Sequence, residues 1–491
     1  MGLLGLGVAF LLNVDCSGFA LLGPYEPWMQ PSNSYRLAGD IGGPMPLGSG
    51  YRWNVPVISY GFDDSFMDYF GIEGSNAVVA AIQTINDLPP ASALVLSNFP
   101  TRATRANYQA QAEGVMDLKS ITMTLLLEQL GLTQPTRNVF VLRRWDQLLE
   151  EWPRQTEWFD WYYDWYIFRR NYDPESLVPS YYVNASLYTG TFLTTYYGAE
   201  ILESRVDLVA TPPTAIADWG IESGLYYTNY TRDDIGGLRY LLSSNNVAFE
   251  FLLAGISGTG TNASSWIDGA LRSGIEKITL VPHPRDGTLG WLSLTNQFID
   301  TFQTNGTYVQ QELMRVTATP DILFSVTNSR SLVQRTDTAN WMNNAAPNGN
   351  TNEAGPGLIR PPIKIVFQKR GATLGTQTIK PSWGWDFQNH TWGSFFGPYA
   401  LTNVITTYPV ASYSGINELQ VNFGILIQSG KYVGPLTTWK LPIPFCDVAV
   451  FQRSTNLVDW DSYVAITNTG SIVDWYHVSF GNQEFFRFVP Q

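Results

Sequence analysis

The pattern of the sequence changes near residue 246, and this change limits the folds that the chain can adopt. Before it, three stretches place apolar residues at helical spacing and have clear start and stop signals: 74–88, 117–130 and 230–242. After it, short runs of β-branched and aromatic residues alternate with turn residues. This order predicts an α+β protein, with an α/β N-terminal domain followed by β-rich, sandwich-like C-terminal domains.

Turn and strand signals support the β-rich half. Asn305 and Gly306 form a pair that favours the type I′ turn, and they separate two strand-like runs at 294–304 and 307–316, which predicts a β-hairpin. The other predicted strands are 51–62, 138–143, 275–281, 363–368, 417–427 and 448–453.

The N-terminus carries a signal for export. Residues 1–12 are apolar, and the small residues Gly18 and Ala20 fit a cleavage rule that predicts a mature start at Leu21. The run is too short to span a bilayer, which takes about 20 apolar residues. We therefore expect a secreted protein with no integral membrane span after signal removal. The alternative for the same residues is a buried N-terminal strand.

These signals divide the chain into predicted segments, in agreement with a length that allows two to four domains. The segments are a signal peptide at 1–20, an extended N-terminal arm at 21–50, an α/β domain with an aromatic insertion at 51–245, a β-rich domain at 246–342, a linker or loop at 343–362, and a sandwich-like domain at 363–491.

The composition excludes some partners. Charged residues make up 14% of the chain, against about 25% in a typical soluble domain, and the net charge is −13. Binding to nucleic acid requires clustered Lys and Arg to neutralise phosphates, so we expect no nucleic-acid partner. The aromatic content of 14% argues against disorder and suits the polar, aromatic-rich surfaces of secreted proteins.

The segment 121–132 resembles the zinc-binding helix of metzincin proteases. Such a helix carries two His four residues apart with a Glu between them, and a Leu-Gly-Leu-like turn then leads to a third His. When the two are aligned on this turn, Thr124 and Glu128 stand at the first two His positions, and Leu125 stands at the Glu position. Gln134 stands at the third His position. None of the three His of the chain is near this helix in sequence.

Two further segments resemble matrixin-type metzincins. Residues 51–62 and the helix after them resemble the opening strand and first helix of that family, and 230–242 resembles its closing helix, with Thr231 as N-cap and Asp233 and Asp234 in the first turn. The resemblance implies a metzincin-like scaffold that has lost its zinc ligands. We therefore predict no metal site, no cofactor and no catalytic residue, and expect that the chain is not an enzyme.

The C-terminal end resembles another group of proteins. The pattern from Gln452 to Trp460, Gln-x-Ser-x-Asn-Leu-x-x-Trp, is followed by Phe-Phe-Arg beginning at Phe485. It resembles the β-sandwich ending of secreted proteins from verrucomicrobial-type bacteria, and the whole chain resembles large uncharacterised secreted proteins of such bacteria. That resemblance implies export but no particular activity.

Aromatic residues gather in two places, 158–172 and 383–392. Such side chains pack in a core, contact a partner chain or stack on sugars, and the sequence leaves these roles open. The candidate interface residues are Trp158, Trp161, Tyr162, Trp165, Tyr166, Trp383, Trp385 and Trp392.

Taken together, these patterns predict a secreted, non-catalytic structural protein. We expect it to self-associate as a subunit of a filament, surface layer or other extracellular assembly, because a low-charge, aromatic-rich surface suits protein contacts. Two alternatives stay open: an extracellular hydrolase of metzincin ancestry, and a protein that binds an extracellular glycan or protein partner.

Overall fold

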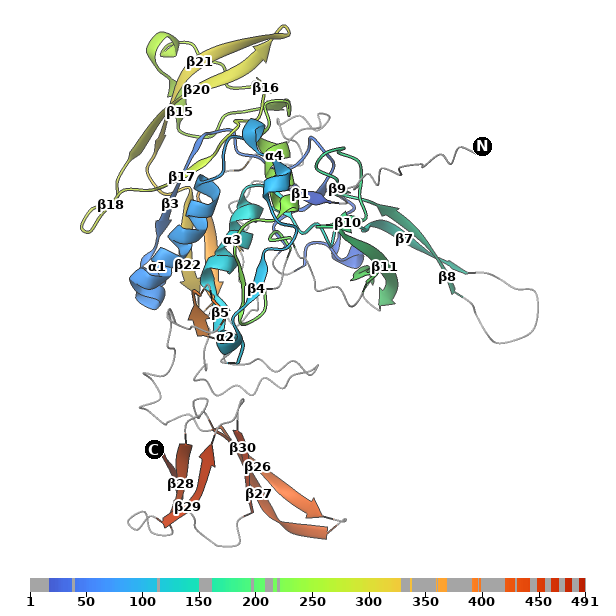
Figure 1. Ribbon diagram of the computed structural model, residues 1–491, viewed down its shortest axis with the longest axis vertical. Helices are drawn as coiled ribbons and strands as arrows, with labels where there is room; N and C mark the ends of the chain where they lie inside the picture. Colours follow the sequence, from blue (N-terminus) through green and yellow to red (C-terminus); the bar gives the residue numbers. More distant parts are fainter. Residues whose placement is uncertain are drawn as a thin grey trace, which may run out of the picture.

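The structure is a computed structural model of the 491-residue chain. Helices and strands are mixed and the strands form several small sheets, so the predicted α+β class is confirmed (Figure 1). The described residues are 17–37, 40–112, 115–149, 161–195, 198–207, 215–218, 221–327, 336–337, 359, 361–368, 391–395, 397–398 and six strands between 420 and 490.

A five-stranded sheet of order β17-β3-β22-β24-β23 forms the centre of the α/β part. The first four strands in this order are parallel, and β23 is antiparallel at the edge. Such a sheet must be covered on both faces, and the apolar side chains of Ile58, Leu280, Phe324, Ile365 and Phe367 are accordingly buried. Its strands are β3 (Val57–Phe62), β17 (Thr279–Pro282), β22 (Ile322–Thr327), β23 (Thr336–Asp337) and β24 (Ile363–Gln368).

This sheet draws its strands from three of the predicted segments, 51–245, 246–342 and 363–491. A hydrogen-bonded sheet is one structural unit, so the predicted boundaries at 245 and 343–362 do not separate domains there. Parallel neighbours need a long connection, and sequence distance therefore says little about which strands pair.

Helix α1 (Asp64–Asn86) packs against the sheet and against α3. The carboxylate of Asp63 accepts a hydrogen bond from Phe66 N at 3.0 Å, so the helix begins at residue 64 and not at 74 as predicted. Gly71, with φ of 60°, interrupts the helix. The apolar spacing after Gly71 therefore does not continue into the residues before it, and the first part of the helix was not predicted. The apolar residues at helical spacing, Val78, Ile82 and Ile85, are buried, whereas Val79 is exposed.

Helix α3 (Leu118–Gln129) confirms the predicted helix around residue 120. The carboxylate of Asp117 accepts a hydrogen bond from Ser120 N at 2.9 Å, which caps the first turn. Gly131 follows the helix with φ of 103°, as expected for a residue that ends a helix. A Cβ atom there would lie 2.1 Å from Tyr51 O, so the close approach of two backbone segments requires glycine.

Helix α4 (Arg232–Leu242) confirms the third predicted helix. Thr231 and Asp234 form a capping box, in which Thr231 N donates to Asp234 Oδ2 at 2.9 Å. Ile235 and Leu238 point into the core, as their spacing predicts.

The start of the described chain is part of the core. Strand β1 (Phe19–Gly23) pairs with β2 (Gly43–Met45), β6 (Leu132–Thr133) and β9 (Asn171–Tyr172), and every residue of β1 is buried. The predicted cleavage before Leu21 would thus cut within a buried strand, and the predicted arm at 21–50 contributes two strands to this sheet.

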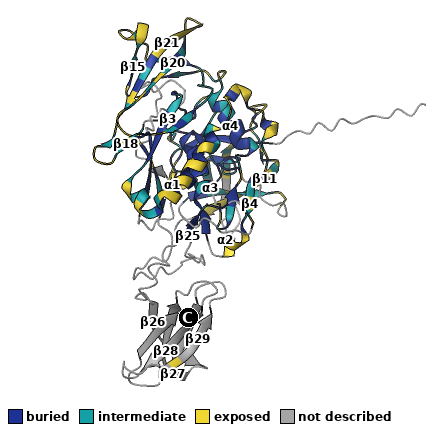
Figure 2. Ribbon diagram, turned by 60° about the vertical axis from the view of Figure 1, so that its left-hand side comes forward, coloured by how far each residue is buried: buried dark blue, intermediate teal, exposed yellow. Residues whose placement is uncertain are grey.

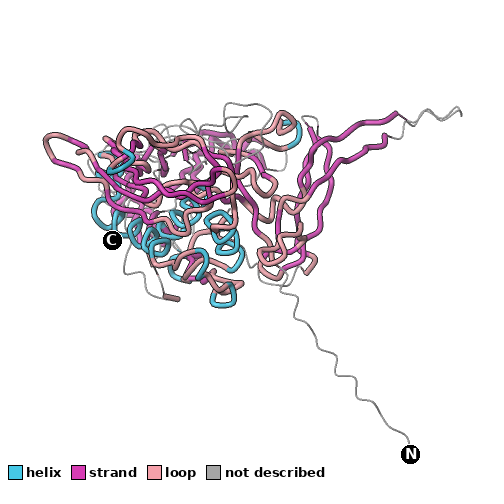
Figure 3. The backbone as a smooth tube through the Cα atoms, turned by 90° about the horizontal axis from the view of Figure 1, so that it is seen from above, coloured by secondary structure: helices cyan, strands magenta, loops and turns pink. Residues whose placement is uncertain are grey.

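Two β-hairpins extend from the body (Figures 1 and 3). One consists of β20 (Leu294–Thr304) and β21 (Thr307–Thr317), and the positive φ angles of Asn305 and Gly306 confirm the predicted turn. The other consists of β7 (Val141–Leu149) and β8 (Trp161–Phe168). The remaining strands of the body are β4 (Thr104–Ala106), β5 (Val115–Asp117), β10 (Tyr182–Val183), β11 (Ser186–Thr195), β12 (Gly198–Arg205), β13 (Leu225–Tyr227), β14 (Ala248–Glu250), β15 (Ile256–Gly258), β16 (Ala270–Arg272), β18 (Arg285–Asp286), β19 (Gly290–Trp291) and β25 (Thr391–Gly393).

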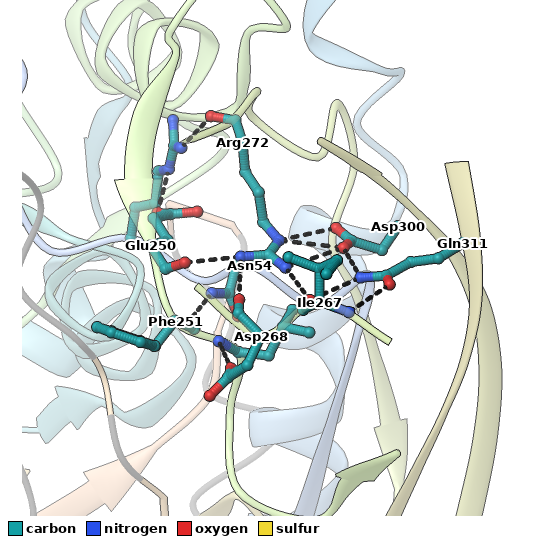
Figure 4. A network of polar contacts seen from close by, with 10 residues as sticks. Asn54, Glu250, Phe251, Ile267, Asp268, Arg272, Asp300 and Gln311 are labelled. Atoms are coloured by element: carbon teal, nitrogen blue, oxygen red, sulfur yellow. Dashed lines mark hydrogen bonds and ion pairs between the residues drawn. The ribbon is translucent and has the colours of Figure 1, made fainter. Parts of the chain in front are cut away.

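A buried polar network joins the sheet of β14, β16, β20, β21 and β15 to the body (Figure 4). Arg272 on β16 lies 3.0 Å from a carboxylate oxygen of Asp300 on β20, and both side chains are buried. Gln311 on β21 donates to the same carboxylate at 2.7 Å. Arg52, before β3, pairs with Glu250 on β14 at 2.7 Å. The bonds of Arg272 and Gln311 to Asp300 attach the middle of the β20–β21 hairpin to β16.

The C-terminal strands form two antiparallel three-stranded sheets, of order β26-β27-β30 and β29-β28-β31. The predicted strands at 417–427 and 448–453 correspond to β26 and β28. Strand β25 instead pairs with β5 in the body, so the predicted segment 363–491 is divided between the two parts. The bounds are β26 (Gln420–Gln428), β27 (Lys431–Leu441), β28 (Val448–Ser454), β29 (Asp461–Thr467), β30 (Val473–Val478) and β31 (Phe485–Pro490).

Candidate functional site

Helix α3 and the turn after it carry Thr124, Glu128 and Gln134, the three residues that the alignment above places at the positions of metzincin zinc ligands. Glu128 is buried, Gln134 is half-buried, and both line a small pocket. Thr124 lies outside this pocket, and its hydroxyl faces the carbonyl of Ser120 at 3.5 Å. The structure therefore brings together two of the three predicted positions. They offer a carboxylate and an amide in place of two imidazoles.

The N-terminal segment covers this pocket. Asp40, Ile41 and Pro44 line it together with Glu128. Arg137 holds the segment in place, because its guanidinium lies 2.7 and 3.1 Å from the two carboxylate oxygens of Asp40. A substrate strand approaching the end of α3 would meet this segment of the same chain.

Throughout the part of the chain that the structure describes, no group of three or more His, Cys, Asp or Glu residues is placed to hold a metal ion. In the same residues, no helix is both long and apolar enough to cross a bilayer.

Asp233, at the start of α4, is completely buried. Its Oδ2 accepts hydrogen bonds from Gly18 N at 2.8 Å and from Asn184 N at 2.6 Å. Its Oδ1 has no hydrogen-bond partner among the described residues. Burial raises the pKa of this carboxyl to about 8. The sequence pattern identified Asp233 as a first-turn acid and gave no sign of its burial.

Two neighbouring acids are buried as well. Asp218 accepts hydrogen bonds from the backbone N–H and the hydroxyl of Thr136 at 3.1 and 2.7 Å, and burial raises its pKa to about 7. Asp234 accepts from Ile216 N and Ala217 N, both at 2.9 Å, and burial raises its pKa too. Asp234 connects the segment 215–218 to α4, and Asp218 connects the same segment to Thr136, so their role is structural.

Ser59, His283 and Asp321 meet in the core, a grouping that the sequence did not suggest. His283 Nδ1 lies 3.1 Å from Ser59 Oγ, and Ser59 donates to Asp321 Oδ2 at 3.1 Å. In a hydrolytic triad the His stands between the acid and the Ser. Here the Ser stands between them, it is 1% exposed, and Arg315 pairs with the acid at 2.6 Å. This arrangement ties strands together and does not activate a nucleophile.

The candidate interface aromatics have different environments. Trp392 is 0% exposed and contacts Phe70 and Phe367 in the core, so its prediction as an interface residue was wrong. Trp165 is half-buried against Phe192, whereas Tyr166 is exposed on the hairpin. Trp158, Trp383 and Trp385 lie outside the described residues, and for Trp161 and Tyr162 only the backbone of β8 is described.

The sequence analysis missed the arginines around this hairpin. Two Arg-Arg pairs belong to this hairpin: 143–144 lies on β7, and 169–170 directly follows β8. Both pairs were visible in the sequence. Each guanidinium stacks on an aromatic ring, which holds it in place and leaves N–H groups at its edge for other partners. The distances from guanidinium carbon to ring centre are Arg143–Phe168 5.2 Å, Arg144–Tyr166 5.5 Å, Arg169–Tyr181 4.5 Å and Arg170–Phe168 5.7 Å. We call these residues the arginine–aromatic surface.

In comparisons with known proteins, no family model, no curated protein and no solved structure matches the chain.

Proposed function

We propose that the chain is an exported, non-catalytic subunit of an extracellular or cell-surface assembly such as a filament or surface layer. The observation that carries this proposal is the outer face of the β20–β21 hairpin. Ile299, Tyr308 and Val316 lie on this face and are 64%, 54% and 41% exposed (Figure 2). Apolar groups on a protruding, ordered hairpin favour contact with another protein.

The arrangement at the end of α3 supports a non-catalytic role. Zinc proteases use imidazole ligands and a Glu general base at fixed spacing on this helix. Here Leu125 stands at the base position, and Asp40 is ion-paired across the pocket. Elemental analysis of the purified protein tests this point, because one tightly held zinc per chain would favour the hydrolase alternative.

Assembly is tested by replacing Ile299 with Lys. We expect the variant to stay folded and to lose large species in analytical ultracentrifugation and in electron micrographs. Ile72→Lys is the matched control, because Ile72 on α1 is also 64% exposed. A wild-type protein that remains a monomer at high concentration would refute the proposal. Equal loss of assembly in Ile299→Lys and Ile72→Lys would show that the hairpin is not the surface through which the chain assembles.

A second candidate function is the binding of an acidic glycan, and the arginine–aromatic surface favours it. Arg forks bind carboxylate or sulfate groups in pairs, and Arg143 and Arg169 are exposed here on a chain of net charge −13. Arg144 is exposed too but pairs with Asp146 at 2.8 Å, and Arg170 is half-buried. Calorimetric titration with carboxylated and sulfated oligosaccharides tests it. Arg169→Gln should weaken binding, whereas Arg105→Gln, on β4, should not.

A further inference from the structure

Asp233 has an environment that calls for a cation. The side chain is 0% exposed, and the groups bonded to its Oδ2 are neutral backbone N–H groups. The titratable groups that interact with it are Asp234, which raises its pKa, and Tyr188. A buried carboxylate with an unpartnered oxygen and acidic neighbours is costly unless it takes up a proton or a positive group joins it.

Ser17 and Gly18 both contact this carboxyl group. Ser17 and Gly18 are both buried, Gly18 N donates to Asp233 Oδ2, and the Ser17 side chain also bonds Asp233. A Cβ atom at Gly18 would lie 2.1 Å from Asn171 Nδ2, so only a bare backbone fits here. The fold thus holds the backbone at Ser17 in a fixed position beside the acid.

We propose that the chain is cut between Cys16 and Ser17 and that the new α-ammonium of Ser17 is the cation that pairs with Asp233. Hydrolysis of this bond by a leader-removing endopeptidase adds one water, leaving a carboxylate on Cys16 and an amine on Ser17 that takes up a proton. Consecutive Cα atoms are about 3.8 Å apart, so this amine lies within one residue of the N–H that already bonds Asp233. Its three N–H donors supply a partner for Oδ1.

The sequence before Ser17 suits such a cut. Cys16 is a small residue directly before the bond and Val14 stands two residues earlier, which follows the A-x-A-like pattern of leader cleavage. The cut predicted before Leu21 would instead remove Phe19 from the core and the Gly18–Asp233 bond. The inference shares with the proposed function the expectation of export and does not depend on assembly or on any partner.

The first test determines the mature N-terminus. The full precursor is expressed in a secreting bacterial host, and the folded, exported protein is analysed by intact mass and N-terminal sequencing. We expect the sequence to begin at Ser17. A start at Leu21, or a folded protein that retains residues 1–16, would overturn the proposal. Assembly is measured separately, so failure here leaves the proposed function standing.

The second test separates the ion pair from the cut itself. Two mature forms are prepared, one with a free Ser17 amine and one with a single extra Gly before it. At pH 7 the free form should melt at least about 5 °C higher. This difference should disappear in Asp233→Asn and persist in Asp234→Asn, the adjacent control. Equal melting of the two wild-type forms would refute the ion pair.

The pH dependence of that difference has a definite sign. The ion pair raises the pKa of the amine above its ordinary value of about 8 and lowers the pKa of the Asp233 carboxyl, so its stabilisation is largest at a pH where both groups are charged. It is lost as pH rises through the folded pKa of the amine and as pH falls through the folded pKa of the paired carboxyl. Amine labelling of the wild-type protein tests the burial of the Ser17 amine directly. The Ser17 amine should react with an acylating reagent only after unfolding, and ready labelling of the folded protein would contradict its burial.

Discussion

Replacing Arg272 with Met should loosen the whole β20–β21 hairpin. The substitution keeps a long apolar side chain at a site that is 2% exposed and removes the charge. The carboxylate of Asp300 would then remain buried, and within this network Gln311 would be the one side chain still bonded to it. The carbonyl of Glu250, which accepts from Arg272 Nη1 at 2.6 Å in a buried position, would lose this donor.

The expected cost follows from these contacts. Removing one partner of a buried ion pair costs about 3–5 kcal/mol, because the other charge is left without compensation. The orphaned carbonyl of Glu250 adds about 1 kcal/mol. The bonds from Arg272 to Asp268 O and Ile267 O are only partly buried, so water replaces them at little cost. We therefore expect a loss of about 4–6 kcal/mol.

The assay should report on the hairpin itself, since a chain of this size does not unfold in one step. Amide hydrogen exchange in β20 and β21 gives the local free energy of opening. Arg285→Met is the control, because Arg285 pairs with Asp64 at the surface and its loss should cost less than about 1 kcal/mol. The double variant Arg272→Met/Asp300→Leu should recover most of the free energy of opening that Arg272→Met loses, because it leaves no uncompensated charge.

Two results would refute this reasoning. A loss in Arg272→Met as small as that in Arg285→Met would mean that the buried pair contributes no more than an exposed one. A double variant as unstable as the single one would mean that the uncompensated charge of Asp300 is not the cause.

Two further predictions follow from single buried groups. Burial raises the pKa of the Asp218 carboxyl to about 7, so its contribution to the free energy of unfolding is complete below about pH 4 and is lost as pH rises through 7. Denaturant titrations at pH 5 and pH 8 should show this decline in the free energy of unfolding, and the decline should be smaller in Asp218→Asn. A decline that Asp218→Asn leaves unchanged would assign the effect to other groups. Gly131→Ala should lower the melting temperature sharply, because φ is positive and the new Cβ would meet Tyr51 O at 2.1 Å; Gly287→Ala, with no atom within 4 Å, should change it little, and similar melting of the two variants would contradict this account.

Local signals in the sequence were sufficient for the ends of several elements. The capping box of Thr231 and Asp234, the glycine after α3 and the Asn305–Gly306 turn each depend on interactions within a few residues. Helix α1 shows where such signals fail. Its first turns precede Gly71, and the cap at Asp63 was not recognised.

The candidate site could be predicted only in part. The loss of imidazoles at Thr124, Glu128 and Gln134 is readable from residue identity alone. That Asp40 and Arg137 bring the N-terminal segment across the same pocket could not be foreseen, because it depends on a contact between distant parts of the chain. Aromatic character likewise did not reveal whether Trp392 faces the core or the solvent.

The sequence by itself determined the α+β class, the caps and turns of individual elements, and the absence of metzincin ligands from α3. The tertiary structure decided which strands share the central sheet, that β1 is a core strand, and that Asp233 is buried beside Ser17. The physical reason is the range of the forces involved. Caps and turns are set by bonds between near neighbours, whereas strand partners and burial are set by apolar packing that brings together residues hundreds of positions apart.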